Sequence, residues 1–247
     1  MHKKLAKSLD AQELEYLNHI GKGSSANVYV AKYRDNIVAV KELDPSVTDV
    51  GQMAKFLVEM ELMANLQHPN ILRFEGMVLS CPKLCMVVEY AKEGSLKDVL
   101  RRNLFLDWRN EKRNLAYCVA SGMEYLHSLN QPVLHKDLKS TNVLVTEWRG
   151  VKISDFGESG VCREGYASGS SPGHGQYDLV GTRLFMAPEV FKGEKYTKEC
   201  DVYSFGCVLA DIALSGKFED LFWRSGKEVR SEEAASDDDL ALVLLAG

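Results

Sequence analysis

Two oxygen-bearing side chains stand at the open end of an expected hairpin. Asn142 precedes the apolar run 143–145, and Asp155 follows the run 151–153. With a turn at 148–149, Asn142 faces Asp155 across the two arms. Amide and carboxylate oxygens suit Mg²⁺ bound to phosphates. The sequence therefore predicts a metal site at Asn142 and Asp155; the alternative is that both side chains cap turns.

A lysine and a glutamate form a second candidate pair. Lys41 ends the apolar run 38–40. At about 100° per residue, Glu59 shares a helix face with Phe56 and Met60, whereas Glu61 points nearly opposite. A carboxylate that faces inward needs a cationic partner, because an unpaired buried charge is costly. We predict that Lys41 is this partner; the alternative is that it is a surface lysine.

A glycine-rich segment lies between two expected strands. Glycines let backbone amides approach phosphate oxygens, since no side chain stands in the way. A strand follows the segment rather than a helix, which excludes a Rossmann arrangement; a plain hairpin turn remains the alternative. The candidate phosphate-binding residues are Ile20, Gly21, Lys22, Gly23, Ser24, Ser25, Ala26, Asn27 and Val28.

The surrounding elements separate into two regions. β-Branched residues over 15–42 predict strands with a turn at 34–36, followed by a helix over 50–66 and strand-like residues over 72–90. After Gly94 helical spacing dominates, with Asp107 as the N-cap of a long helix and another helix over 198–214. Residues 165–175 have the composition of a loop.

The motifs occur in a recognisable order. After the glycine loop, Lys41 and Glu59 come the segments HKDLKSTN at 135–142, DFG at 155–157 and APE at 187–189. Together they resemble the eukaryotic-type protein kinase domain, serine/threonine, of the tyrosine-kinase-like group. The resemblance implies an α+β, bilobal fold with a small β-rich N-lobe (15–90) and a helical C-lobe (91–216) that lacks its last helices. Residues 1–14 are then an N-terminal extension, and 217–247 an atypical acidic tail.

The resemblance also assigns roles. Asp137 accepts the proton of the substrate hydroxyl, Lys139 contacts the transferred phosphate, and Lys41 with Glu59 completes the catalytic set. Lys139 and Thr182 indicate serine/threonine rather than tyrosine specificity.

In the nucleotide site, the backbone of Glu89 and Ala91 is expected to meet the adenine edge, next to Val88 as gatekeeper. Val28, Ala39 and Leu144 are expected to enclose the adenine faces, although apolar residues there could equally be core. The resemblance further implies a regulatory stack of Met63, Phe74, His135 and Phe156.

Two departures from the family pattern stand out. Lys136 replaces the usual arginine and lacks its bidentate fork, so we expect weaker control by phosphorylation of the loop hydroxyls. The candidate hydroxyls are those of Ser168, Ser170, Ser171, Tyr177 and Thr182.

The second departure lies toward the end of the chain. The usual arginine partner of Glu189 is missing, unless Arg224 or Arg230 replaces it. The helix over 198–214 is apolar on several faces, so we expect instability, self-association or a covering partner, with Phe218, Leu221, Phe222 and Trp223 as a possible substitute lid.

The overall composition excludes some classes of protein. The net charge of −5 over 247 residues gives no overall attraction for nucleic acid, and neither a signal peptide nor a membrane segment is evident. Six cysteines form no CxxC pair, which predicts buried reduced thiols in a cytoplasmic protein. The resemblance to protein kinases implies ATP and Mg²⁺ as cofactors and a protein substrate with a serine or threonine acceptor. The alternatives are a pseudokinase or truncated fragment that binds nucleotide or acts as a scaffold, and a small-molecule phosphotransferase, which Thr182 and the segment at 187–189 disfavour.

Overall fold

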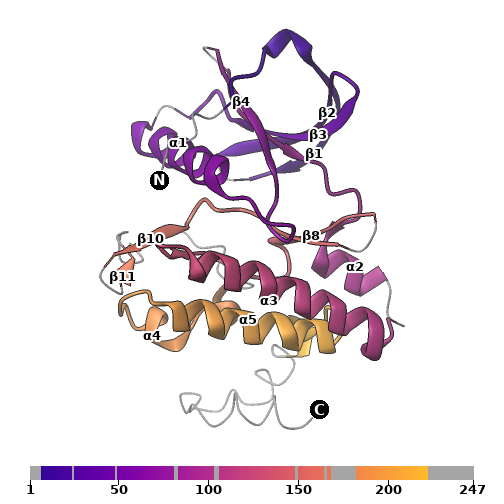
Figure 1. The fold of residues 1–247 in the computed structure, drawn as a ribbon, viewed down its shortest axis with the longest axis vertical. Helices are drawn as coiled ribbons and strands as arrows, with labels where there is room; N and C mark the ends of the chain where they lie inside the picture. The colour runs from indigo at the N-terminus through magenta and orange to yellow at the C-terminus, as the bar shows by residue number, and fades with distance from the viewer. Residues whose placement is uncertain are drawn as a thin grey trace.

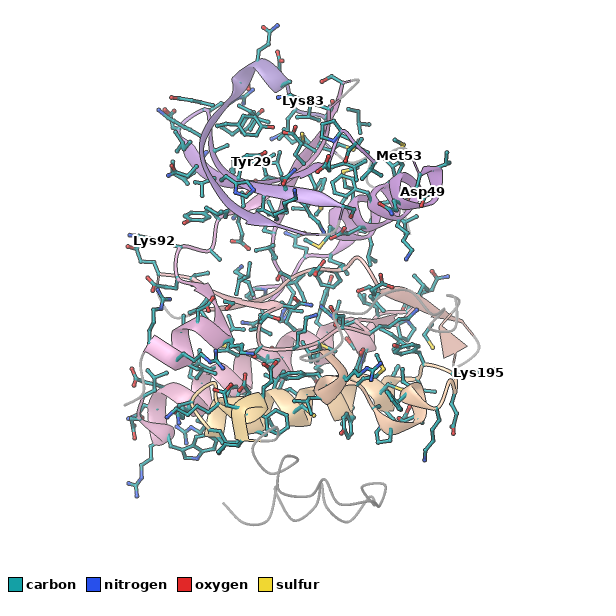
Figure 2. The ribbon with its side chains drawn as sticks, turned by 180° about the vertical axis from the view of Figure 1, so that it is seen from behind. Tyr29, Asp49, Met53, Lys83, Lys92 and Lys195 are labelled. Atoms are coloured by element: carbon teal, nitrogen blue, oxygen red, sulfur yellow. The ribbon has the colours of Figure 1, made fainter. Side chains whose placement is uncertain are left out.

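The chain folds into two lobes joined by a short connection. The computed structural model describes residues 7–23, 25–47, 49–80, 83–102, 106–147, 150–163, 166–167 and 182–221. A small sheet with one helix forms the N-lobe, and a mainly helical C-lobe lies below it in Figure 1. Lys92 lies where the chain has passed from one lobe to the other (Figure 2). The bilobal α+β prediction is confirmed.

The N-lobe sheet has five antiparallel strands in the order β1-β2-β3-β5-β4. Its strands are β1 (Leu14–Lys22), β2 (Ala26–Tyr33), β3 (Asn36–Leu43), β4 (Phe74–Ser80) and β5 (Lys83–Glu89), preceded by the 3-10 turn η1 (Ala11–Glu13). One side of this sheet forms an apolar core of its own around Val40 and Val87, both fully buried. The β-branched residues that predicted strands therefore supply the packing of this lobe.

The helix of the N-lobe is α1 (Val50–Asn65), close to its predicted bounds. Asp49 caps it by accepting a hydrogen bond from the Gly51 amide. Phe56, Glu59, Met60 and Met63 are buried, whereas Glu61 is exposed. The predicted inward orientation of Glu59 is confirmed.

The C-lobe contains two long helices, α3 and α5, which lie side by side, and several short strands (Figure 1). The helical elements are α2 (Leu96–Arg102), the π-helical turn η2 (Trp108–Lys112), α3 (Arg113–Ser128), the 3-10 turn η3 (Thr182–Phe185), α4 (Pro188–Phe191) and α5 (Lys198–Ala213). The strands are β6 (Gly94–Ser95), β7 (Val133–Leu134), β8 (Val143–Val145), β9 (Val151–Ile153), β10 (Gly160–Arg163) and β11 (Tyr166–Ala167). Asp107 caps η2, as predicted for the start of this helical segment.

The β8–β9 hairpin corrects one prediction. Val143 pairs with Ile153 and Val145 with Val151, and the Thr146 amide donates to the Gly150 carbonyl. Three residues, 147–149, thus connect the arms instead of the expected two-residue turn. Because this shifts the register by one residue, Asn142 lies opposite Ser154 and not opposite Asp155.

Packing continues beyond both predicted boundaries of the domain. Leu9 is buried in the N-lobe core, where residues 7–9 run beside β4 through Met77. Phe218 is buried in the C-lobe core with its ring against Phe185. The folded unit therefore begins before residue 15 and extends past residue 216.

Coverage of α5 is uneven. Cys200, Asp201, Ser204, Cys207, Val208, Asp211 and Ile212 are buried. Val202 remains 60% exposed on the outward side, although the helix was expected to need cover all round. Of the predicted lid, Phe218 is buried in the same core as α5 and its amide donates to Asp211, whereas Leu221 is 40% exposed. Phe222 and Trp223 lie outside the described residues.

Two further expectations concern membrane segments and cysteines. None of the helices in the described ranges has the length and apolar character needed to cross a membrane. Cys85, Cys162, Cys200 and Cys207 are buried free thiols and Cys118 is half-buried, in line with the predicted reduced thiols; Cys81 lies outside the described residues.

Candidate active site

An ion cluster lies on the N-lobe side of the junction between the lobes. Lys41, on β3, has its Nζ atom 2.7 Å and 2.9 Å from the two carboxylate oxygens of Glu59 on α1. The same Nζ lies 3.4 Å from Oδ1 of Asp155, which follows β9 in the C-lobe. The predicted partnership of Lys41 and Glu59 is therefore present, and it extends to Asp155.

The cluster favours the charged forms of Lys41 and Asp155, whereas burial raises the pKa of Glu59. Burial lowers the pKa of Lys41, but the Glu59 and Asp155 carboxylates outweigh burial and leave this pKa above its usual value. Burial likewise raises the pKa of Asp155, but the positive charge of the adjacent Lys41 ammonium outweighs burial and leaves this pKa below its usual value. Lys41 is thus held as an ammonium and Asp155 as a carboxylate.

The catalytic-loop residues converge on one carboxylate. Oδ2 of Asp137 accepts a hydrogen bond of 2.8 Å from the Asn142 side-chain amide and lies 2.9 Å from Nζ of Lys139. The Asn142 amide also donates to the backbone carbonyl of Asp137. Both donors therefore fix the orientation of the Asp137 side chain. Three of the predicted site residues meet in this contact.

Asn142 and Asp155 reach the site by a route that the sequence did not predict. The Ser154 amide and hydroxyl both donate to the Asn142 carbonyl, which places Ser154 directly opposite Asn142. Asp155 comes one residue later, with a φ of +62° that turns the chain out of the strand. A left-handed residue at this point, rather than strand register, directs Asp155 into the ion cluster.

The donor chemistry of these two residues fits Mg²⁺. Within the described residues, no group of three or more His, Cys, Asp or Glu side chains is arranged to hold a metal ion. Mg²⁺ commonly takes one or two carboxylates together with substrate phosphates, which is a smaller set. The Asn142 amide nitrogen is engaged with Asp137, so its carbonyl oxygen is the atom left for a cation. Asp155 contributes a carboxylate that is 49% exposed.

Asp201 anchors the start of the catalytic loop, a role that the sequence reasoning missed. Its two oxygens accept from the backbone amides of His135 and Lys136 at 2.9 Å each, and Oδ2 also lies 2.8 Å from Nε2 of His127. Asp201 is 1% exposed on α5. The signal was a carboxylate within an apolar helix, because such a group requires several donors.

His135 connects the loop to the end of β9. Its Nε2 atom lies 3.0 Å from the Ser154 carbonyl, and its Nδ1 atom lies 3.3 Å from the Asp137 amide. These two contacts fit a neutral imidazole with its proton on Nε2. The ring also packs against Phe156 with centroids 5.1 Å apart. Met63 and Phe156 belong to one buried core, and the half-buried Phe74 packs against that core; the order of the four residues as a regulatory stack stays a prediction.

The predicted nucleotide-binding residues lie on strands of both lobes and in the connection between the lobes. Gly21 pairs with Val28 and Lys22 with Asn27 across the β1–β2 hairpin, which the Gly23 amide closes by donating to the Ala26 carbonyl. Ser25 lies in this turn, and Ser24 is outside the described residues.

The apolar residues of this site come from both lobes. Ile20 is 50% exposed on β1, Ala39 is buried between Val30 and Val88, and Leu144 is half-buried on β8. In the connection, the Glu89 amide donates to the Arg73 carbonyl, and the Ala91 carbonyl accepts from the Gly94 amide.

Lys136 and Glu189, where the chain departs from the family pattern, have other partners in the structure. Lys136 has a φ of +66° and places Nζ 5.4 Å from the centre of the Tyr196 ring, where burial lowers its pKa. Glu189 accepts from the Cys200 thiol at 3.4 Å. The side chain of Thr182 and the residues Ser168, Ser170, Ser171, Tyr177, Arg224 and Arg230 lie outside the described part of the structure.

Comparisons with known proteins agree with this geometry. The model of the protein kinase domain matches residues 14–238. The chain is 36% identical over 208 residues, 84% of its length, to the "Probable serine/threonine-protein kinase drkB" of Dictyostelium discoideum. It is 39% identical over 203 residues, 81% of its length, to the "Serine/threonine-protein kinase CTR1" of Arabidopsis thaliana. The matched regions span 29% and 24% of these two relatives. The chain therefore belongs to the protein kinase domain family.

Proposed function

We propose that this chain transfers the γ-phosphoryl group of ATP to a serine or threonine hydroxyl of a protein substrate. The observation that carries the proposal is the Asp137 carboxylate, which Lys139 and Asn142 hold through one oxygen, Oδ2. Its other oxygen, Oδ1, takes no part in those contacts and is available to a substrate hydroxyl. The printed descriptions of the relatives, which are serine/threonine-protein kinases, support the same reaction.

The chain's own residues divide the work. Asp137 accepts the proton of the attacking hydroxyl, while Lys139 offsets the negative charge on the transferred phosphoryl group. Lys41 binds a phosphate of ATP, because the ion pair with Glu59 fixes the position of its ammonium. Asn142 and Asp155, together with the phosphates of ATP, would hold Mg²⁺, which would neutralise negative charge on the phosphates.

Backbone groups of the segment that joins the two lobes are proposed to bind adenine. The Glu89 amide and the Ala91 carbonyl already make backbone hydrogen bonds. An adenine edge would therefore pair with the opposite groups, the Glu89 carbonyl and the Ala91 amide. Val28, Ala39 and Leu144 would enclose its faces. A cytoplasmic location fits both an ATP-consuming reaction and buried free thiols.

The test is an assay with radiolabelled ATP and Mg²⁺ on the purified chain, with and without a generic basic protein. Phosphoamino-acid analysis of the product is expected to give phosphoserine or phosphothreonine. Asp137→Asn is the control, and it should remove the label. Phosphotyrosine as the main product would contradict the residue specificity. Nucleotide binding without any transfer would instead identify a pseudokinase or a scaffold module.

A further inference from the structure

A second buried carboxylate of α5 reaches the catalytic loop. Asp211 is 0% exposed and accepts a hydrogen bond of 2.5 Å from the hydroxyl of Ser140, which is 1% exposed. Ser140 lies between Lys139 and Asn142 in the loop. The backbone of Ser140 is also held, because its carbonyl accepts from the Lys97 amide of α2 at 3.2 Å. Ser140 is thus fixed through both its side chain and its main chain.

The other oxygen of Asp211 holds the segment that follows α5. Oδ1 accepts from the Phe218 amide at 3.1 Å, and the Phe218 ring packs edge-on against Phe185 at 6.0 Å. The segment turns back at Gly216, whose φ is +76° and whose carbonyl accepts from Arg101 of α2. One carboxylate therefore joins the catalytic loop, α5 and the returning segment.

The charges around Asp211 explain how it can stay buried. Burial raises the pKa of its carboxyl group, while the Ser140 hydroxyl, the Phe218 amide and the ammonium of Lys97 oppose that rise. Lys97 in turn forms an ion pair with Glu219 of the returning segment. A carboxylate with no such donors would be strongly destabilised at this depth. Every group that favours the charge comes from the loop, from α2 or from the returning segment.

Two anchors on one helix bracket the catalytic residues. Asp201 holds the amides of His135 and Lys136 at the start of the loop, and Asp211 holds Ser140 near its end. The two aspartates are ten positions apart in the sequence, which corresponds to about 15 Å along α5. Asp137 and Lys139 lie between the anchored points of the loop. A rigid helix therefore sets the span of the segment that carries them.

We propose that Asp211 is a positioning residue for phosphoryl transfer, acting through the Ser140 hydroxyl on the placement of Asp137, Lys139 and Asn142. This inference rests on the proposed function for its kinetic part. Because Asp211 is fully buried, its effect would pass through Ser140 and not through direct contact with ATP or the protein substrate. Loss of the link should let the loop shift, and a displacement of about 1 Å can cost roughly 100-fold in rate.

The experiment compares five variants of the purified chain, one of which combines Asp211→Ala with Ser140→Ala. Asp211→Ala and Ser140→Ala remove the link from either side. Asp211→Asn is the conservative variant, because its carbonyl can accept from Phe218 while its amide donates to Ser140. Val208→Ala is the matched control, since it removes apolar volume from a fully buried position of α5 and leaves the hydrogen bond between Asp211 and Ser140 in place. Kinetics, thermal unfolding and amide hydrogen exchange over residues 137–142 are measured for each.

We expect Asp211→Ala and Ser140→Ala to lower kcat by roughly 10- to 100-fold, with little change in the KM for ATP. Their double variant should be no worse than the worse single variant, because both remove one link. Amide exchange over 137–142 should rise in both. Asp211→Asn should recover most of kcat, and Val208→Ala should lower the melting temperature but leave kcat and loop exchange unchanged.

Other outcomes decide against the proposal. Unchanged exchange over 137–142 in both Ser140→Ala and Asp211→Ala would overturn it, as would a kcat loss no larger than that of Val208→Ala. If Asp211→Ala does not fold, Ser140→Ala and Asp211→Asn still give the exchange comparison. If the unmodified chain transfers no phosphoryl group, the proposed function fails, and exchange alone decides whether Asp211 positions the loop.

Discussion

The ammonium of Lys41 bridges both carboxylate oxygens of Glu59, at 2.7 Å and 2.9 Å. This contact joins β3 to α1, and it is made by a glutamate that is only 5% exposed. Because the helix cannot move away without leaving that carboxylate unpaired, the pair fixes the position of α1 relative to the sheet. The position of α1 and the readiness of Lys41 to bind phosphate are therefore coupled.

Glu59→Gln is expected to lower kcat/KM for ATP by roughly 100-fold, since neutral glutamine holds the Lys41 ammonium less firmly than a carboxylate does. Glu61→Gln is the matched control, because Glu61 lies two residues away on the exposed side of the same helix. Steady-state phosphoryl transfer at varied ATP is the measurement. Equal losses in the two variants would show that the effect comes from helix charge rather than from the ion pair.

Asp137→Asn should reduce turnover by about 10²- to 10⁴-fold, the usual contribution of a positioned general base. ATP affinity should change little, because the predicted nucleotide contacts lie elsewhere. Asp35→Asn, in the exposed β2–β3 turn, serves as the control. The comparison uses initial rates at saturating ATP, and an Asp137→Asn variant as active as the control would exclude the proposed role.

Mg²⁺ with ATP should raise the melting temperature, because a ligand that binds only the folded state stabilises it. Asp155→Ala should abolish the part of this rise that requires Mg²⁺, since it removes the carboxylate proposed to hold the metal. Thermal unfolding is followed with ATP in the presence of Mg²⁺ or EDTA. A rise that is independent of the metal in both proteins would point to nucleotide binding without the proposed site.

Asp155 also predicts a pH dependence of stability. Its pKa in the folded chain lies below the usual 3.8, so its stabilising contribution is present above about pH 4 and is lost as the pH falls through the lower folded value. Asp155→Asn should therefore lower the melting temperature most near neutral pH, with the difference shrinking below about pH 4. Melting temperatures of both proteins from about pH 7 to pH 3 provide the check. A difference that persists unchanged at the acid end would refute the assigned pKa direction.

Local periodicity was sufficient to predict one half of the site. Glu59 was recognisable because a helix places residues three and four apart on one face, and Lys41 was the cation at the end of a neighbouring strand. The β8–β9 register was not predictable in the same way, because it depends on a three-residue connection that the composition did not reveal. The expected pairing of Asn142 with Asp155 was wrong by one residue for this reason.

The two aspartates of α5 illustrate a different limit. Both share the buried side of the helix with Val208 and Ile212. Their partners are two backbone amides and a serine hydroxyl that lie far away in the sequence. Such contacts depend on how the lobe packs, which a single sequence does not specify. The general rule that a buried carboxylate requires donors could still have marked both as candidates.

Gly76 lies on β4 where the N-terminal segment runs parallel to that strand. The Met77 amide donates to the Lys7 carbonyl and the Leu9 amide donates to the Met77 carbonyl, both at 2.8 Å. A Cβ atom on Gly76 would lie 2.6 Å from Cγ of Leu9 and 2.7 Å from the Lys7 carbonyl oxygen. Only glycine therefore allows the segment to approach this closely.

Gly76→Ala is expected to destabilise the chain by about 1–3 kcal/mol, because the buried Leu9 side chain and the segment's backbone must both shift. Gly206→Ala is the matched control, since no atom lies within 4 Å of its Cβ position in α5. That substitution should be neutral or stabilise the chain by about 0.5–1 kcal/mol, through higher helix propensity. Urea unfolding of both variants gives the comparison. If Gly76→Ala is as stable as Gly206→Ala, the N-terminal segment does not pack against β4 in solution.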